Sequence, residues 1–326
     1  MIWRTIIAGM MVALSWIGAT PAWSAETRPP APPWVSPLAR EAPHTGEIRD
    51  IRNGALLTPD ALIERFAAVD FVLLGERHDN PDHHRLQAWI ADRLFARGQP
   101  YALAIEMIDS SQSGQLTDYL AKSPRDAAGL GAALNWDESG WPDWQLYQPI
   151  AEAALSRGLP ILPANLPPDL VRAIAMNGLT GLPAPLAHSL QLAPDRDSAI
   201  LADHAAEIQA VHCGMLPERS LAPFALAQYA RDAQMARVMA DQWQQSNGKT
   251  KDVLIAGAGH VRTDRGVPFH LARMAPNARV LSLAFIEARD GDAPRQDLSS
   301  LPYDLVWLTA RVDDGTNACD KLKPAR

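Results

Sequence analysis

Short apolar segments alternate with helical patterns along most of this chain, and this alternation constrains its fold more than any other feature. The apolar segments are rich in Val, Leu and Ile, and we expect buried strands at residues 70–75, 101–106, 160–164, 252–257, 279–285 and 303–309. Apolar residues spaced by three and four positions predict helices between them, at residues 82–97, 144–157, 195–210 and 222–245. Strands that are apolar throughout are typical of a parallel sheet with both faces covered. The prediction is therefore an α/β fold, with a mostly parallel β-sheet flanked by helices.

The length of the chain, 326 residues, is compatible with one α/β domain or with two smaller domains. Residues 110–245 show mainly helical patterns with few strand signals, so we expect a helical subdomain inserted into the α/β core. The whole domain is predicted at residues 46–315, and residues 316–326 are predicted to be a frayed tail. One domain with a helical insertion is the organisation that we favour.

The N-terminus has the parts of a secretory signal peptide. Arg4 supplies a positive charge, residues 5–17 are apolar and uncharged, and small residues follow up to Ala25. The apolar run is shorter than the ~20 residues that a transmembrane helix needs; an uncleaved membrane anchor is the alternative. We expect residues 1–24 to be removed and the protein to be exported to the periplasm. Because this region has no cysteine, a lipid-modified N-terminal cysteine is excluded.

A proline-rich segment, residues 25–45, follows the expected cleavage site. Proline favours extended polyproline II conformation and cannot continue a helix. We therefore expect a spacer between the cleavage site and the domain, with a recognition motif as the alternative.

Charge and cysteine content exclude several classes of protein. The chain has 30 Lys and Arg residues against 37 Asp and Glu residues, a net charge of -7, whereas a nucleic-acid surface needs a basic stripe. Two cysteines are too few for a disulfide-dense scaffold or a four-thiolate metal site. Cys213 and Cys319 could pair in an oxidising compartment, and the sequence leaves that question open.

Polar residues follow three of the expected strands. Glu76 and His78 follow the first strand, Glu106 closes the second, and His260 follows the strand at 252–257. Because ligands bind beyond the carboxyl ends of parallel strands, these side chains are candidates for acid–base work or for a shared metal. The alternative for the first strand is an ion pair with Arg77 and capping of the next helix.

The segment after the strand at 252–257 superficially resembles a dinucleotide-binding motif. Gly257 and Gly259 match its first two glycines, but Arg262 stands where the third is expected. A Rossmann-type cofactor is therefore excluded, and the two glycines indicate close approach of the backbone instead.

Three tryptophans lie close together in residues 136–144, interrupted by Gly140 and Pro142. Such a loop is either clamped onto the core or forms a wall for a flat apolar ligand. Further along the chain, His212 lies between two expected helices, and Arg231 and Asp232 lie on the more polar side of the second one, where a surface salt bridge would explain them.

Taken in order, the motifs over roughly residues 46–290 resemble the ChaN-type haem-binding proteins of the wider Tiki/TraB/GumN-like superfamily. No single motif is specific, but their order and number are. The matching segments are Leu-Leu-Gly-Glu-x-His-Asp-Asn-x-x-His-His (73–84), Glu-Met (106–107), Gly-Trp-Pro-x-Trp-x-x-Tyr (140–147), Ala-Asn-Leu-Pro (164–167), His-Cys-Gly-Met (212–215), Gln-x-x-Arg-Asp-x-x-Met-Ala (228–236), Gly-x-Gly-His (257–260) and Gly-Val-Pro (266–268).

The resemblance implies non-covalent haem binding at the cell envelope, linked to iron acquisition. It also implies a homodimer that shares its haems and an outer-membrane haem receptor as partner. Tyrosinate ligation of iron is known in this family, and Tyr147 and Tyr229 are the tyrosines in the matching motifs. The other candidate haem-binding residues are Trp141, Trp144 and His212. Unlike lipoprotein members, this chain lacks the N-terminal lipid-bearing cysteine.

The wider superfamily implies a competing function. Its hydrolytic members use a Gly-Glu pair and a Gly-x-x-His element, which Gly75-Glu76 and Gly257-x-x-His260 match. In a metal-dependent hydrolase or peptidase, Glu76 would be the general base, and His260 would be the second catalytic residue. Glu76, His78, Glu106 and His260 would then hold a divalent metal ion. Haem binding explains the export signal and the tryptophan-rich loop, hydrolysis explains the polar residues, and an inactive scaffold is the third alternative.

Overall fold

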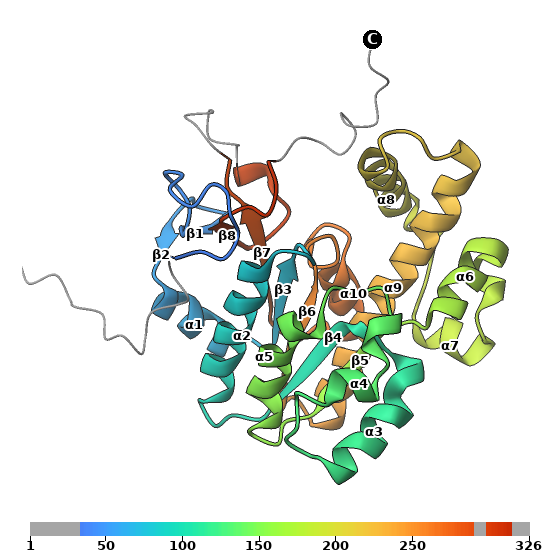
Figure 1. Cartoon of the computed structure of the whole chain (residues 1–326). Coiled ribbons are helices and arrows are strands. Elements are labelled where there is room, and N and C mark those ends of the chain that lie inside the picture. The colour runs from blue at the N-terminus through green and yellow to red at the C-terminus, as the bar shows by residue number, and fades with distance from the viewer. Residues whose placement is uncertain (1–32, 290–297, 315–326) are drawn as a thin grey trace, which may run out of the picture.

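The computed structural model describes residues 33–289 and 298–314 of the chain. These residues form an eight-stranded sheet in the order β2-β1-β8-β7-β3-β6-β4-β5 (Figure 1). Strands β3 to β8 are parallel to their neighbours among themselves, whereas β1 is antiparallel to both β8 and β2. The strands are β1 (Ile48–Asp50), β2 (Leu56–Leu57), β3 (Phe71–Glu76), β4 (Tyr101–Asp109), β5 (Ile161–Asn165), β6 (Lys251–Gly257), β7 (Val280–Glu287) and β8 (Leu305–Thr309).

The predicted α/β fold, with a mostly parallel sheet flanked by helices, is confirmed, and all six expected strands are present. The sequence does not predict β1 and β2, because they are only three and two residues long. They form one edge of the sheet, where β1 pairs with β8 from the other end of the chain.

Helices cover both faces of the sheet. One face is covered by α1 (Pro59–Ala67), α2 (Pro81–Phe95), α3 (Ser113–Lys122), α4 (Leu130–Ala133) and α5 (Trp144–Leu155); the other by α6 (Pro168–Asn177), α9 (Glu218–Gln245) and α10 (Val267–Met274). Both faces of the sheet are apolar and need a cover, because successive side chains of a strand point to opposite faces. Strand β6 is an example. Val253 and Ile255 join the first core, whereas Leu254 and Ala256 join the second.

The region predicted as a helical insertion, residues 110–245, holds α3 to α9 and also β5, which pairs with β4 in the sheet. Helices α3 to α5 lie on the sheet, whereas α7 (Ala184–Ser189), α8 (Ser198–Val211) and the first half of α9 stand out on one side of the molecule, beside α6 (Figure 1). We call α8, the turn after it and the start of α9 the arm (residues 198–226). The described 3-10 helices are η1 (Ser110–Gln112), η2 (Trp136–Glu138), η3 (Gly178–Gly181) and η4 (Leu298–Ser300).

The end of the predicted spacer, from residue 34 onward, is part of the fold. Trp34 is buried, and the backbone N–H groups of Val35 and Ser36 donate to the Asp82 carboxylate at 3.0 and 2.8 Å. Asp82 lies in the first turn of α2, so this segment is fixed to the start of that helix. The predicted signal peptide and the tail at 316–326 lie outside the described residues. None of the described helices is long and apolar enough to cross a membrane.

Candidate functional site

Polar side chains meet at the carboxyl ends of three neighbouring strands. Glu76 ends β3, Glu106 lies near the end of β4, and His260 follows β6, which lies between the other two. All three side chains are buried. Together with their partners they form what we call the strand-end cluster: Glu76, His78, His84, Glu106, Tyr147, Arg231, Asp232 and His260. The fold therefore brings together the four residues predicted as metal ligands.

Glu76 is the centre of one half of the cluster. Its Oε1 accepts hydrogen bonds from His78 Nδ1 and from the Tyr147 hydroxyl, both at 2.8 Å. His84 Nδ1 lies 3.2 Å from its Oε2. Burial alone would raise the pKa of Glu76, but the charges of His84 and His78 outweigh burial and lower the pKa to about 2. Burial opposes a positive charge on each histidine too, yet the Glu76 carboxylate raises both of their pKa values. Glu76 is therefore a carboxylate with its proton donors already in place.

Glu106 is the centre of the other half. Its Oε1 accepts from Arg231 Nη2 at 2.6 Å and lies 3.0 Å from His260 Nε2, while its Oε2 accepts the Gly257 N–H at 2.7 Å. His260 Nδ1 also donates to Asp232. Burial alone would lower the pKa of His260, but the charges of Glu106 and Asp232 raise it to about 9. The His260 imidazole is therefore protonated at neutral pH and bonded on both of its nitrogens.

Arg231 is held in place by acceptors from three elements. Its Nε donates to Asn165 on β5 at 3.1 Å, its Nη1 to Gln228 on α9 at 3.0 Å, and its Nη2 to Glu106 on β4. A guanidinium with this many fixed acceptors keeps one orientation, because each hydrogen bond restricts its plane. Sequence reasoning treated Arg231 as a surface residue, whereas the structure makes it the cation that neutralises Glu106.

His78 lies between the two halves and faces solvent on one side. A Cβ added to Gly257 would lie 2.9 Å from His78 Nε2, so any other residue at this position would require the His78 ring to move. The His78 side chain is 33% exposed, and its ring packs at 5.0 Å from the ring of the partly buried Trp141. His78, with Trp141 beside it, is therefore the most exposed part of the cluster.

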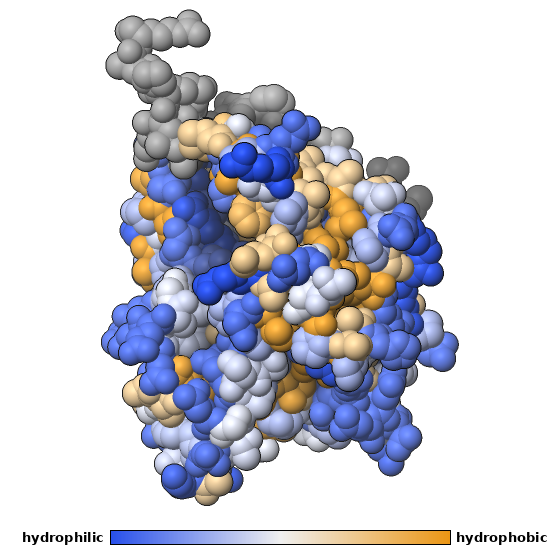
Figure 2. Space-filling model, turned by 90° about the vertical axis from the view of Figure 1, so that its right-hand side faces the viewer, coloured by the Kyte–Doolittle hydropathy of each residue, from blue (hydrophilic) through white to orange (hydrophobic). Residues whose placement is uncertain are grey.

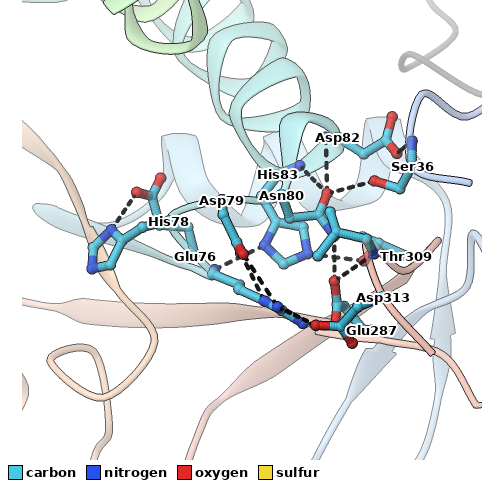
Figure 3. A network of polar contacts seen from close by, with 12 residues as sticks. Ser36, Glu76, His78, Asp79, Asn80, Asp82, His83, Glu287, Thr309 and Asp313 are labelled. Atoms are coloured by element: carbon cyan, nitrogen blue, oxygen red, sulfur yellow. Dashed lines mark hydrogen bonds and ion pairs between the residues drawn. The ribbon is translucent and has the colours of Figure 1, made fainter. Parts of the chain in front are cut away.

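A second polar network fixes the loop between Glu76 and α2, on the other side of Glu76 from His78 (Figure 3). The Arg77 N–H donates to His83 Nδ1 at 2.9 Å, so the neutral ring donates from Nε2 to Thr309, also at 2.9 Å. Burial lowers the pKa of His83 to about 3, which keeps the ring neutral. Asn80 caps α2 and donates to Glu287 at 2.8 Å. These contacts hold His83 and Asn80 as structural residues.

The strand-end cluster does not have the arrangement of a metal site. Within residues 33–289 and 298–314, no group of three or more His, Cys, Asp or Glu side chains is placed to hold a metal ion. In the described structure the two acids face other partners: Glu76 faces the rings of His78 and His84, and Glu106 is paired with Arg231. Sequence reasoning placed Asp232 at the surface, whereas it is buried, and it missed the contacts of His84 and Tyr147 with Glu76. The sequence does contain a signal for Arg231 and Asp232 as site residues, because both are charged residues within a long helix that has an apolar face.

The two tyrosines predicted as haem ligands are buried. Tyr147 donates its hydroxyl to Glu76, and burial together with the Glu76 charge raises its pKa strongly. Tyr229 donates to Asp197, and burial together with that hydrogen bond raises its pKa. Both hydroxyls are thus occupied by carboxylates within the fold, and their role as haem ligands stays a prediction.

The tryptophan-rich loop is clamped onto the core, as one of the two sequence interpretations has it. Trp144 Nε1 donates to the Ala127 carbonyl at 2.9 Å, and Trp136 Nε1 donates to the Pro142 carbonyl at 2.7 Å. The rings of Trp136 and Trp144 contact each other edge to face at 4.7 Å and are buried. Of the three tryptophans, Trp141 is the one that reaches the surface.

His212, by contrast, is exposed at the end of the arm. Its Nδ1 donates to the Ile208 carbonyl at 2.7 Å at the C-terminus of α8. The neighbouring Val211 and Met215 are 66% and 62% exposed, which is high for large apolar side chains. Cys213 lies in the same turn, with a φ of 62°. Its proposed disulfide partner, Cys319, lies outside the described residues, so the pairing stays a prediction.

Comparisons with known proteins agree with the geometry of the fold. Residues 62–271 match the family described as "Haem-binding uptake, Tiki superfamily, ChaN". The solved structure described as "Cofacial heme binding to ChaN of Campylobacter jejuni" is similar, with a TM-score of 0.65, 22% sequence identity, and coverage of 83% of this chain and 98% of that one. The type III effector HopBA1 has a TM-score of 0.42 and 15% identity over 77% of this chain and 93% of its own. An erythromycin esterase variant in its open conformation has a TM-score of 0.43 and 15% identity over 82% of this chain and 83% of its own. No curated protein matches the chain.

Proposed function

Because the chain belongs to the ChaN family of haem-binding uptake proteins in the Tiki superfamily, we propose that it is an exported protein that binds haem non-covalently and takes part in haem or iron acquisition. The match covers more than half of the sequence. The similar Campylobacter jejuni structure is described as binding cofacial haems, which supports haem as the ligand here. A homodimer and an outer-membrane haem receptor are partners that family membership suggests.

The observation that carries the proposed haem site is the arrangement of His212. Histidines that ligate a metal usually donate their other ring N–H to a carbonyl or carboxylate, which fixes the tautomer. His212 Nδ1 donates to the Ile208 carbonyl, so the lone pair lies on Nε2 of an exposed ring. Histidine is a common axial ligand of haem iron. We therefore propose His212 as the ligand, in preference to the buried Tyr147 and Tyr229.

The surroundings of His212 fit the apolar face of a haem. Val211 and Met215, which flank it along the chain, are both exposed. Figure 2, which views the side of the molecule that carries α6 to α9, shows apolar surface among polar residues on this face. Burying apolar area contributes roughly 25 cal/mol per Å2, so a flat porphyrin against these side chains gains affinity without further polar contacts.

Titration of the mature protein with hemin tests the proposed function. We expect a saturable shift of the Soret band, because ligation by an imidazole changes the electronic environment of the iron. A protein in which Val211 and Met215 are both changed to Ser should bind hemin more weakly, since it loses the apolar contacts. Absence of any saturable shift with the unmodified protein would refute haem binding.

A second candidate function is metal-dependent hydrolysis or peptide cleavage at the strand-end cluster, although no three of its described side chains are placed to hold a metal ion as they stand. One observation favours it. The cluster combines strongly shifted pKa values with a half-exposed imidazole, which is common at catalytic sites. Elemental analysis of protein purified without chelators tests the metal directly. Near-stoichiometric metal, with turnover lost in Glu76→Gln, would support hydrolysis; a metal-free protein would remove it.

A further inference from the structure

We propose that the arm is a hinged lever that closes toward the core, and that His204 on α8 is the residue that holds it closed. Closure forms a hydrogen bond from His204 to Asp232, whose other oxygen accepts from His260 in the strand-end cluster. His212, the proposed haem ligand, lies at the end of the same helix. The position of the haem ligand is thereby coupled to the cluster, and this last step rests on the function proposed above.

The contact between His204 and Asp232 is almost formed. His204 Nε2 lies 3.6 Å from Asp232 Oδ2, which is longer than the ~2.7–3.2 Å of a hydrogen bond. Both atoms are buried, and neither has a hydrogen-bond partner within the residues that the structure describes. Because a buried polar atom without a partner is unfavourable, a movement that joins the two is favoured, and an approach of about half an ångström is sufficient. A neutral imidazole can donate from Nε2, so the bond requires no change of charge.

Helix α8 is held by few buried contacts. Of its 14 residues, all of which the structure describes, His204 alone is buried, and the others are half-buried or exposed. Figure 1 shows α8 beside the first half of α9 and away from the sheet. A helix with few buried contacts moves at low cost in free energy, because little apolar surface has to leave its neighbours. The arm can therefore move relative to the sheet.

The start of α8 is the fixed point of the lever. Asp197, the residue before the helix, accepts hydrogen bonds from Arg273 Nη1 and Nη2 at 2.5 and 2.6 Å, and from the hydroxyl of the buried Tyr229. Arg273 lies on α10 and Tyr229 on α9, beyond the end of the arm. A bidentate pair of this kind keeps its orientation. Movement of α8 therefore increases from Asp197 toward His212.

The second connection of the arm contains a proline. Pro223 lies inside α9, near the end of the arm. It has no N–H to donate to the carbonyl of Arg219, and its ring crowds the preceding turn, which bends or weakens a helix at that point. After Pro223 the helix packs on the sheet, where Ala233 and Met239 are buried. The start of α9 can therefore follow α8 while the rest of the helix stays on the core.

The loop that carries His260 contacts the arm as well. Arg265 in this loop forms an ion pair with Glu207 on α8, and among the described residues its buried Nε has no hydrogen-bond partner. The loop is tight, because the Val267 N–H donates to the His260 carbonyl at 2.7 Å. The arm thus reaches His260 through two contacts, one at Asp232 and one at Arg265.

The geometry of a helix sets the size of the movement at the end of α8. With a rise of ~1.5 Å per residue, His204 lies about 10 Å and His212 about 22 Å from Asp197. Closing by about half an ångström at His204 therefore moves the backbone of His212 by about 1 Å. Because the axial ligand tunes haem iron, closure of the arm and haem binding influence each other, and this influence is reciprocal.

Hydrogen exchange of the full-length mature protein without haem, measured by mass spectrometry, tests the contact. His204→Leu removes the donor but keeps an apolar side chain, and we expect the amides of α8 to exchange about tenfold faster or more, with unchanged rates in β3 and β6. His204→Gln, whose amide can still donate to Asp232, should recover part of the protection. Ala206→Gln, at an exposed position of the same helix, is the matched control and should exchange as the unmodified protein does. Equal rates in α8 of His204→Leu and of the unmodified protein would overturn the proposal.

Pro223→Ala tests the hinge without changing the contact. Alanine supplies the missing N–H, so α9 becomes regular and the arm stiffer. We expect the amides of α8 and of residues 218–226 to exchange severalfold more slowly than in the unmodified protein. Equal or faster exchange would contradict the hinge even if His204→Leu does not fold.

The coupling to the cluster is measured without haem. Pro223→Ala changes the arm alone, so a shift of the NMR signals of the His260 ring nitrogens in this variant reports the position of the arm, which a purely structural role of His204 would not produce. We expect such a shift, and we expect none in Ala206→Gln. Identical His260 signals in Pro223→Ala and in the unmodified protein would overturn the coupling.

The effect on haem is measured separately. We expect the hemin affinity of His204→Leu to fall severalfold, and that of Ala206→Gln to equal the affinity of the unmodified protein. Unchanged hemin affinity in a His204→Leu protein whose α8 exchanges faster would overturn the coupling to the haem ligand. If the unmodified protein does not bind hemin, the function proposed above fails, whereas the exchange and NMR measurements still decide whether the arm closes through His204.

Discussion

The strand-end cluster and the end of the arm both present histidines, but the fold uses them in opposite ways. In the cluster, His78, His84 and His260 each face a buried carboxylate. At the end of the arm, His212 donates only to a backbone carbonyl and its ring is exposed among apolar side chains. Charge pairing inside the cluster therefore contributes first to stability. The His212 imidazole faces no carboxylate and is the better candidate for an iron ligand.

The largest expected effect is a difference between the two regions in how far a substitution lowers the free energy of unfolding. Glu106→Ala leaves Arg231 and His260 buried without their shared carboxylate, and breaking a buried ion pair in this way costs about 3–5 kcal/mol. Urea unfolding should therefore show a large loss for Glu106→Ala and a change within about 0.5 kcal/mol for the exposed His212→Ala. Equal losses of stability for the two substitutions would contradict the expected difference between the cluster and the arm.

The pH dependence of stability gives the next largest effect. The folded pKa of His260 is about 9, above its ordinary value of 6.5, so its contribution is fully present below pH 6.5 and is lost as pH rises through 9. We expect the free energy of unfolding to fall by roughly 3 kcal/mol over that range. The free energy of unfolding of His260→Gln should not show this decline. If the unmodified protein also shows no decline, its His260 imidazole is not held as a cation.

Asp252 is a third kind of buried acid, and replacing it should increase stability. It is fully buried at the start of β6, neither of its carboxyl oxygens has a hydrogen-bond partner within the described residues, and burial raises its pKa well above the ordinary value. Asp252→Val removes an unsatisfied buried polar group, worth about 1–3 kcal/mol.

The gain from Asp252→Val should depend on pH. The unfolded chain ionises this carboxyl above about pH 4 while the folded chain does not, so the native aspartate costs more stability as pH rises from there. Denaturation at acidic and neutral pH measures the difference. A loss of stability at neutral pH would show that the carboxyl has a stabilising partner.

The smallest expected effect concerns the packing of His78. Gly257→Ala would put a Cβ at 2.9 Å from His78 Nε2, so the ring has to move. We expect the free energy of unfolding to fall by about 1 kcal/mol, with unchanged hemin binding, because the arm is untouched. Urea unfolding and Soret titration of the same preparation measure the two. Loss of hemin binding in Gly257→Ala would indicate that the haem lies at the strand-end cluster.

The fold follows from the sequence because its signals are local. The parallel strands β3 to β8 are continuous apolar runs, and the helices between them have apolar residues at helical spacing, so neither depends on distant residues for its recognition. By contrast, β1 and β2 are too short to give a signal, and the anchoring of Ser36 on Asp82 depends on a contact between segments 46 residues apart.

The candidate site is only partly predictable for a related reason. Strand ends identify Glu76, Glu106 and His260, because parallel strands bring their carboxyl ends to one edge. Which charges neutralise these acids depends on the packing of α2 and α9: His84 and Arg231 lie 8 and 125 positions from the acids they face. The sequence pattern therefore indicates a polar site, whereas the partners of its acids follow from the tertiary structure.

The most direct measurement of the central claim is a comparison of the hemin complexes of three proteins: the unmodified chain, His212→Ala and Tyr147→Phe. If His212 ligates the iron, His212→Ala shifts the Soret band and weakens binding by tenfold or more, whereas Tyr147→Phe keeps the spectrum of the unmodified protein. An unchanged spectrum in His212→Ala together with a shifted one in Tyr147→Phe would contradict the account and assign the iron to the buried tyrosine.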